Sequence, residues 1–219
     1  MSRRHREAGV IKTLFLDIGG VLLNNGWDHL ARRRAAKHFK LNRAEMEQRH
    51  GLNFETHEED KLAFNEYLDR VVFYKKRPFT RAEFRHFMFA QSKPVAGMME
   101  LVRSLKARFG LKIIVVSNES RELNAHRIST FKLAGFVDAF ISSCFVHLRK
   151  PDAAIFQLAL DIAQTPVHQV VYIENTPMFI EVAEGFGIRS ILHTDYKSTC
   201  AKLAAFGLRN DAGATHETN

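Results

Sequence analysis

The chain has 219 residues, 46% of them hydrophobic and 26% charged, a length and composition that allow one or two globular domains and exclude whole-chain disorder. No apolar stretch approaches the roughly 18 residues of a membrane helix, and two cysteines cannot form a disulfide framework, so we expect a cytoplasmic protein without a membrane partner. The formal net charge of +8 favours an anionic ligand, which by composition alone is nucleic acid, an acidic membrane or a small phosphorylated molecule.

Short apolar runs along the chain predict strands, because strands that are buried on both faces are continuously apolar. The predicted strands are residues 11–16, 112–116, 139–142, 170–173 and 190–193. Helical patterns are predicted at residues 97–108, 121–134, 152–164, 177–186 and 197–206. This alternation predicts an α/β fold, with a parallel Rossmann-like sheet sandwiched by helices. The polar ends, residues 1–9 and 209–219, are predicted to be tails.

Residues 25–94 contain no strand pattern and are predicted to be helical. Asn42 with Glu45, and Thr80 with Glu83, have the spacing of helix-capping boxes. Phenylalanines at helical spacing are expected to fill a separate core in this segment: Phe39, Phe64, Phe84 and Phe87. The sequence therefore predicts a helical cap domain, 25–94, inserted into an α/β core domain made of 10–24 plus 95–208.

Polar residues follow four predicted strands, where open parallel sheets bind their ligands. In chain order they are Asp17, Ser117 with Asn118, Lys150, and Glu174 with Asn175. A hydroxyl beside backbone amides can cradle an anion, and a lysine can hold a phosphate. An acid next to an amide offers oxygen ligands for Mg²⁺. Each residue alone could be an ordinary turn, cap or surface residue, but together they predict one site.

In this arrangement the sequence resembles the haloacid dehalogenase (HAD) superfamily of phosphohydrolases. Four segments carry the resemblance: Leu16-Asp17-Ile18-Gly19-Gly20-Val21-Leu22, Val115-Val116-Ser117-Asn118, Arg149-Lys150-Pro151-Asp152 and Glu174-Asn175. The helical insert after the first strand matches the position of the family's type 1 cap. The resemblance therefore implies a hydrolase with a helical cap that chooses the substrate.

The resemblance also implies a role for each residue of the predicted site. Asp17 would attack phosphorus and form an aspartyl-phosphate, and Lys150 would orient Asp17 and share the phosphate charge. Ser117 and the amide of Asn118 would hold the phosphoryl oxygens. Mg²⁺ would be held by Asp17, the backbone carbonyl of Gly19 and Asn175, with Glu174 beside it. The implied substrate is a small, anionic phosphorylated molecule, and Trp27 just past the hinge could pack on it.

Two positions depart from the family pattern. Gly19 stands where these enzymes place a second Asp, which protonates the leaving alcohol and activates water; such assistance contributes roughly 10²- to 10⁴-fold. A cap residue such as His29, or a metal-bound water, is a candidate substitute. Asn175 is a neutral amide where an anion is usual, so we expect weaker Mg²⁺ binding.

Three alternatives to a phosphatase follow from the same residues. One is a catalytically impaired HAD-fold protein that binds a phosphorylated ligand or a partner. Another is a 2-haloacid dehalogenase, which needs the nucleophilic Asp17 but no metal; Gly19 lacks the aromatic side chain usual there. The third is nucleic-acid binding, which the basic charge allows but no motif supports, so no nucleic-acid partner is expected.

Overall fold

A computed structural model of the protein describes residues 10–209, so residues 1–9 and 210–219 of the predicted tails lie outside the described residues. Its core is a five-stranded sheet in the order β3-β2-β1-β4-β5, and neighbouring strands are parallel. The strands are β1 (Thr13–Leu16), β2 (Lys112–Ser117), β3 (Ala139–Ser142), β4 (Val170–Glu174) and β5 (Arg189–Leu192). The predicted parallel α/β sheet is confirmed.

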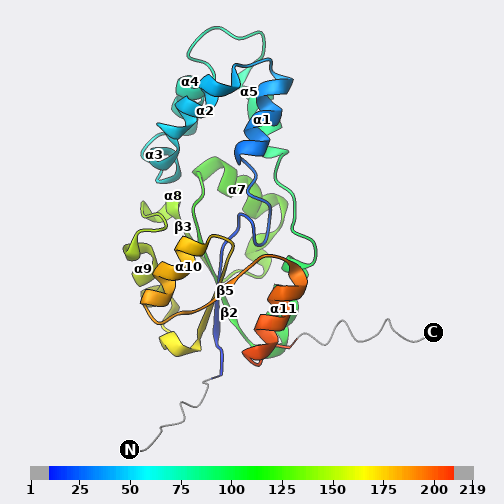
Figure 1. Cartoon of the computed structure of the whole chain (residues 1–219), viewed down its shortest axis with the longest axis vertical. Helices are drawn as coiled ribbons and strands as arrows, with labels where there is room; N and C mark the ends of the chain where they lie inside the picture. The colour runs from blue at the N-terminus through cyan, green and yellow to red at the C-terminus, as the bar shows by residue number, and fades with distance from the viewer. Residues whose placement is uncertain (1–9, 210–219) are drawn as a thin grey trace, which may run out of the picture.

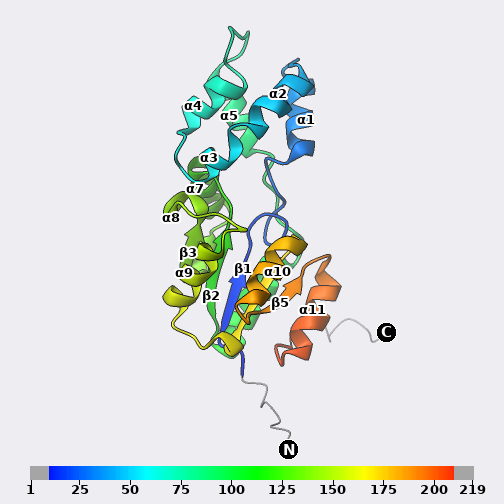
Figure 2. The same ribbon diagram turned by 60° about the vertical axis from the view of Figure 1, so that its left-hand side comes forward.

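Helices pack on both faces of this sheet and form three layers (Figures 1 and 2). The helices that follow the insert are α6 (Met98–Phe109), α7 (Arg121–Thr130), α8 (Ser143–Val146), α9 (Ala153–Ala163), α10 (Pro177–Gly185) and α11 (Tyr196–Ala205). Leu14 and Leu16 of β1 pack with residues of α6 and α11. Phe15 lies in the opposite cluster, with residues of α9 and α10. This alternation follows from the two-residue period of a strand.

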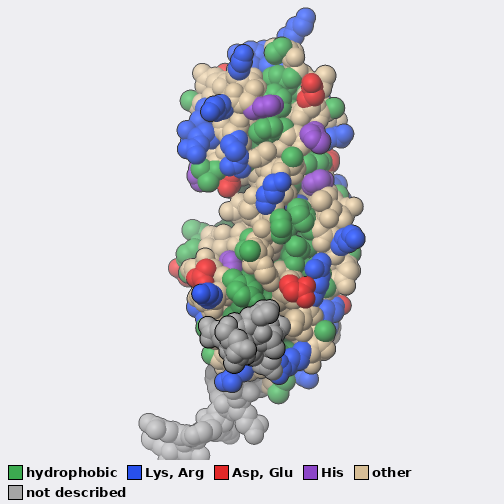
Figure 3. All heavy atoms as spheres, turned by 90° about the vertical axis from the view of Figure 1, so that its right-hand side faces the viewer, with side chains coloured by type: hydrophobic (Ala, Val, Ile, Leu, Met, Phe, Trp, Pro, Cys, Tyr) green, Lys and Arg blue, Asp and Glu red, His purple; other side chains and the backbone are tan. Residues whose placement is uncertain are grey.

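A separate group of helices lies beyond the carboxyl ends of the strands (Figure 1). They are α1 (His29–His38), α2 (Arg43–Gly51), α3 (Phe54–Glu58), α4 (Phe64–Val71) and α5 (Arg81–Phe89). Phe64 and Phe84 are buried in the core of this group, and Phe39 and Phe87 pack against it half-buried, as predicted. Figure 3 shows the surface narrowing between this upper lobe and the lobe that contains the sheet.

Side chains at the N-caps of two of these helices fix where the helices begin, as predicted. The Asn42 side chain accepts a hydrogen bond from the Glu45 N–H at the start of α2. Thr80 and Glu83 form a reciprocal capping box at the start of α5. Because these bonds satisfy backbone N–H groups that have no partner within the helix, they set where each helix begins.

The two chain segments that connect the lobes pair with each other. The Asn24 N–H donates to the Lys93 carbonyl at 2.9 Å, and the Asn24 side chain accepts from the Lys93 N–H at 3.0 Å. The buried Arg127 of α7 donates to Ser92 Oγ at 3.1 Å and to the Asn24 carbonyl at 3.3 Å. Gly26 has φ +64°, and a Cβ there would lie 1.8 Å from Arg127 Nη2. Only glycine therefore leaves room for this arginine.

Local differences from the sequence prediction concern helix ends. The helix predicted to span 121–134 ends at Thr130, because Lys132 adopts a left-handed φ of 52° before a short 3₁₀ turn. The short α8 was not predicted. Pro177 begins α10, but Thr176 makes no side-chain cap bond. No helix within residues 10–209 is long and apolar enough to cross a membrane.

Candidate active site

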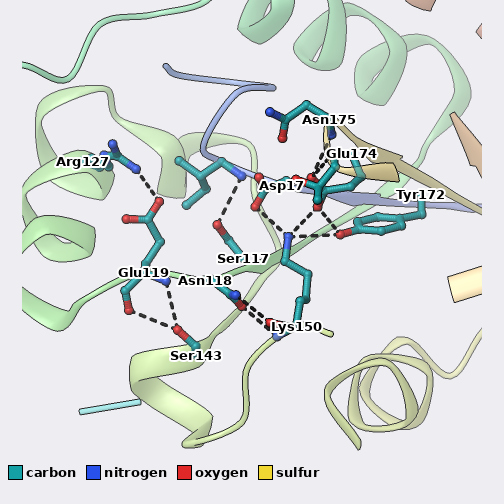
Figure 4. Close-up of polar contacts among 12 residues, drawn as sticks. Asp17, Ser117, Asn118, Glu119, Arg127, Ser143, Lys150, Tyr172, Glu174 and Asn175 are labelled. Atoms are coloured by element: carbon teal, nitrogen blue, oxygen red, sulfur yellow. Dashed lines mark hydrogen bonds and ion pairs between the residues drawn. The ribbon is translucent and has the colours of Figure 1, made fainter. Parts of the chain in front are cut away.

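The parallel strands bring the predicted site residues to one edge of the sheet (Figure 4). Asp17 directly follows β1, Ser117 ends β2, and Glu174 ends β4. Since β1 lies between β2 and β4, the carboxyl ends of these three strands are neighbours. Lys150 reaches the same point from the loop before α9.

Lys150 lies between two carboxylates. Its Nζ is 2.9 Å from Asp17 Oδ1, 2.6 Å from Glu174 Oε2 and 3.1 Å from the Tyr172 hydroxyl, and the side chain is 1% exposed. A buried charge needs such partners. Burial lowers the pKa of Lys150, but the attraction of Asp17 and Glu174 outweighs burial and leaves this pKa above its ordinary value. Lys150 is therefore a cation held against Asp17.

Glu174 uses both of its oxygens inside the protein. Oε1 accepts hydrogen bonds from the backbone N–H groups of Asn175 at 2.8 Å and Thr176 at 2.9 Å. Oε2 accepts from Lys150 and, at 2.5 Å, from the Tyr172 hydroxyl. The residue is fully buried. These four contacts make Glu174 an anchor for Lys150, whereas its predicted place beside the metal ion stays a prediction.

Asp17 is buried beside this anion. Burial, followed by the negative charge of Glu174, raises the pKa of Asp17 from 3.8 to about 7. The charge of Lys150 and a hydrogen bond with Ser117 act in the opposite direction. Positive charge at this point therefore favours the carboxylate form, which is the form that can act as a nucleophile.

This pKa has a consequence for the stability of the metal-free protein. Because the folded pKa of Asp17 lies above its unfolded value, the stability that Asp17 contributes is full below about pH 4 and is lost as the pH rises through about 7. We expect Asp17→Asn, measured in EDTA, to raise Tm by several °C at pH 8 and by much less at pH 4.5. Circular-dichroism melts at both pH values test this, with the exposed Asp161→Asn as control. Equal gains at both pH values would contradict the expectation.

Ser117 and Asn118 support the neighbouring residues directly. Ser117 is 1% exposed, and its Oγ accepts from the Ile18 N–H at 3.4 Å. The Asn118 side chain accepts from the Lys150 N–H at 2.8 Å and donates to the Lys150 carbonyl at 2.9 Å. This pair of bonds fixes the backbone of Lys150. Phosphate binding by Ser117 and the Asn118 amide stays a prediction.

A cavity of about 320 Å³ lies between the sheet edge and the helical lobe. Five of the predicted site residues line it: Asp17, Gly19, Asn118, Lys150 and Asn175. Ser117 and Glu174 lie behind its wall. The helical lobe and the connection to it contribute Trp27, Asp28, Arg32, His50, Phe54, His57, Glu58, Tyr67 and Met88. His29, the candidate substitute for the missing acid, is exposed and is not a lining residue, so that suggestion is wrong for this conformation.

Two histidines of the helical lobe line the cavity as neutral rings. Trp27 Nε1–H donates to the Tyr67 hydroxyl at 2.9 Å, and this hydroxyl also hydrogen-bonds with His50 Nδ1 at 2.8 Å. Burial lowers the pKa of His50 to about 3. His57 Nδ1–H donates to the Leu62 carbonyl at 2.9 Å, and burial lowers the pKa of His57 as well. Neither ring carries an extra proton at neutral pH.

The residues around Asp17 fit a magnesium ion. The Asn175 side-chain N–H₂ donates to the Gly19 carbonyl oxygen at 3.1 Å and to Glu174 Oε1 at 2.9 Å, so binding of an ion by the Asn175 oxygen requires this amide to turn. Gly20 has φ +81°, and a Cβ there would lie 2.2 Å from the nearest terminal atom of the Asn175 amide, so glycine is required for this approach. A carboxylate, a carbonyl and an amide oxygen are hard ligands that suit Mg²⁺. Within residues 10–209, no cluster of three or more His, Cys, Asp or Glu could hold a metal, so this set carries little negative charge.

A family model identifies the class of protein that this fold and site define. The model of haloacid dehalogenase-like hydrolases matches residues 11–187. The chain therefore belongs to the haloacid dehalogenase-like hydrolase family. A comparison with curated proteins gave no significant match.

Solved structures with the same fold include HAD family enzymes. A HAD family enzyme of Bacteroides thetaiotaomicron is 20% identical with a TM-score of 0.72, covering 85% of this chain and 95% of its own. A predicted HAD-like family hydrolase of Porphyromonas gingivalis is 16% identical with a TM-score of 0.72, covering 92% and 100%. An L-2-haloacid dehalogenase is 15% identical with a TM-score of 0.61, covering 83% and 86%. At these identities the likeness establishes the fold.

Proposed function

We propose that this protein is a magnesium-dependent phosphatase that hydrolyses small anionic phosphate monoesters through an aspartyl-phosphate on Asp17. The observation that carries the proposal is the position of the buried cation Lys150, 2.9 Å from Asp17 Oδ1, in the wall of a cavity that Gly19 and Asn175 also line. In this proposal residues 25–94 act as the cap, and residues 10–24 with 95–208 act as the catalytic core.

The chemistry follows from the charges around Asp17. Its carboxylate forms a bond to phosphorus while the bond from phosphorus to the leaving-group oxygen breaks, and water later hydrolyses the aspartyl-phosphate. A carboxylate and a phosphate repel each other, and Lys150 offsets that repulsion from a fixed position. Mg²⁺ held by Asp17, the Gly19 carbonyl and Asn175 would supply further positive charge to the phosphoryl oxygens. Glu174 and Tyr172 keep Lys150 in place.

Known structures support the choice of metal and anion. The HAD family enzyme of Bacteroides thetaiotaomicron has also been solved in a complex with magnesium and inorganic phosphate; that structure is 19% identical to this chain, with a TM-score of 0.70. Around Asp17 this chain offers a carboxylate, the Gly19 carbonyl and the neutral Asn175 amide. We therefore infer that this protein uses Mg²⁺, with an affinity lower than that of a site with two carboxylate ligands.

Phosphate release from p-nitrophenyl phosphate and a panel of phosphorylated metabolites, with Mg²⁺, tests the proposal. We expect turnover by the wild type and at least a thousandfold loss in Asp17→Asn, because the amide cannot form the acyl-phosphate bond. The exposed Asp161→Asn is the matched control and should keep full activity. Wild-type turnover no higher than that of Asp17→Asn would favour a binding protein instead. Halide release from 2-chloropropionate would favour a dehalogenase.

A further inference from the structure

The proposed reaction needs a proton for its leaving group, and the core supplies no acid for it. Gly19 has no side chain at the position where a carboxylate would serve. A Cβ there would lie 3.1 Å from Asn25 Oδ1, so a neutral amide occupies the adjacent space. Without an acid, an alkoxide would have to leave, which slows the cleavage of alkyl phosphates. A second acidic side chain in the cavity wall would supply this proton.

Most titratable side chains that line the cavity are already committed. Asp28 Oδ1 accepts from the Ala31 N–H at 2.7 Å as the N-cap of α1. Glu119 forms an ion pair with Arg127, and both side chains are at most 2% exposed. The Tyr67 hydroxyl lies 2.9 Å from Trp27 Nε1 and 2.8 Å from His50 Nδ1, and burial raises its pKa well above the ordinary value. Burial lowers the pKa of His50 and His57, so both rings are neutral at pH 7, and the buried His57 Nε2 makes no hydrogen bond among the described residues. Apart from Asp17 and Lys150, Glu58 is a carboxyl of this wall whose pKa is raised by burial and whose side chain is still 26% exposed.

Glu58 is fixed over the site by the core itself. It ends α3, and its carbonyl accepts from Ser143 Oγ at 2.7 Å; Ser143 Oγ also accepts from the Glu119 N–H at 2.9 Å. Its carboxylate Oε2 accepts from Arg149 Nη2 at 2.9 Å. Glu119 directly follows Asn118, and Arg149 directly precedes Lys150. Arg149 therefore belongs to the loop that carries Lys150, and Ser143, at the start of α8, links Glu58 to the residue after Asn118.

We propose that Glu58 is the general acid and base of this active site and takes the place of the side chain missing at Gly19. In the first step the Glu58 carboxyl proton passes to the leaving-group oxygen as its bond to phosphorus breaks, which releases an alcohol. In the second step the Glu58 carboxylate takes a proton from the water that attacks phosphorus, and Asp17 is released. The proton count closes, because Glu58 ends the cycle protonated as it began.

The surroundings of Glu58 are consistent with this role. Burial raises the pKa of Glu58, while the charges of Arg149 and Lys150 act against that rise and Asp17 adds to it. Arg149 contacts one carboxylate oxygen, Oε2, through Nε at 3.3 Å and Nη2 at 2.9 Å. Among the described residues Glu58 Oε1 makes no hydrogen bond, and the side chain, which lines the cavity, is 26% exposed. One oxygen is thus held while the other can face a substrate.

The test separates this role from a structural one by varying the leaving group, and it rests on the proposed phosphatase function. Glu58→Gln keeps the shape and can still accept from Arg149 but carries no acidic proton. We expect kcat/KM for n-butyl phosphate to fall at least roughly a hundredfold. For p-nitrophenyl phosphate, whose leaving group needs no proton, kcat/KM should change less than about threefold. Slowed hydrolysis of the aspartyl-phosphate should also produce a burst of about one p-nitrophenolate per active site.

Glu55→Gln is the matched control, because Glu55 lies on the same helix and contacts Arg149 Nη1 at 2.9 Å but does not line the cavity; both substrates should react at wild-type rates. Glu58→Asp keeps the acid and should retain more alkyl phosphatase activity than Glu58→Gln. If Glu58→Gln does not fold, the same test uses Glu58→Asp: its kcat/KM for n-butyl phosphate should fall more than its kcat/KM for p-nitrophenyl phosphate. Equal losses on both substrates, or none on either, overturn the role of Glu58. Wild-type inactivity on both would overturn the phosphatase proposal itself.

Discussion

Lys150→Met should abolish phosphatase activity and lower the stability of the protein. Methionine has nearly the same volume but no charge, so Asp17 and Glu174 lose the cation that lies 2.9 and 2.6 Å from them. Removing one partner from a buried ionic group costs about 3 kcal/mol or more. For a chain of this length we expect Tm to fall by roughly 6–12 °C. We expect kcat/KM for p-nitrophenyl phosphate to fall at least roughly a hundredfold, because phosphate repulsion at Asp17 is no longer offset.

A second lysine gives the control for this experiment. Lys106 Nζ lies 2.6 Å from Asp138 Oδ1, but both side chains are substantially exposed. Lys106→Met should therefore cost less than about 1 kcal/mol and leave activity unchanged. Thermal melts and initial rates of both variants make the comparison. A Lys150→Met protein that is folded and retains more than one tenth of wild-type activity would argue against the proposed mechanism.

The sequence predicts the sheet well because its strands are continuously apolar. Each observed strand lies within two residues of its predicted position, and the order of the strands brings Asp17, Lys150 and Glu174 together as expected for residues at strand ends. Local polar signals also set helix starts correctly at Asn42 and Thr80. Strand hydrophobicity and helix capping both depend on residues close together in the chain, so a single sequence is enough to predict them.

The sequence does not indicate which polar residues face the cavity and which lie behind it. The carboxylate of Glu174 accepts hydrogen bonds from the next two backbone N–H groups. The Glu174 side chain therefore turns inward, and Asn175 lies at the cavity wall. The sequence pattern does not mark Tyr172 as part of the site, although it lies two residues before Glu174 on β4 and therefore on the same face of the strand. That spacing is the signal that could have identified it.

The contribution of the helical lobe to the site depends on long-range contacts, which the sequence pattern does not contain. Glu58 is one of seven consecutive polar residues, 55–61, that follow Phe54, and nothing in that run distinguishes it. Glu58 is held at the cavity by hydrogen bonds with Ser143 and Arg149, which are 85 and 91 residues away in the sequence. The same holds for Arg127, which reaches Asn24 across 103 residues.

Gly19→Asp should restore alkyl phosphatase activity to the Glu58→Gln protein. Gly19 does not have a positive φ, and its Cβ would lie 3.1 Å from Asn25 Oδ1 and 3.9 Å from Asp17 Oδ2. The exposed Asn25 side chain can move by the few tenths of an ångström that this contact requires, so the fold should persist. The new carboxyl group would then lie beside the nucleophile and could protonate the leaving group.

Because the two acids would perform the same step, their effects should not be additive. In the Glu58→Gln background we expect Gly19→Asp to raise kcat/KM for n-butyl phosphate by roughly tenfold or more, and in the wild type by a smaller factor. Gly19→Asn has the same shape without the proton and should rescue neither protein. The four kcat/KM values form a double-mutant cycle. Equal factors in both backgrounds would mean that Glu58 and the side chain at position 19 act on different steps.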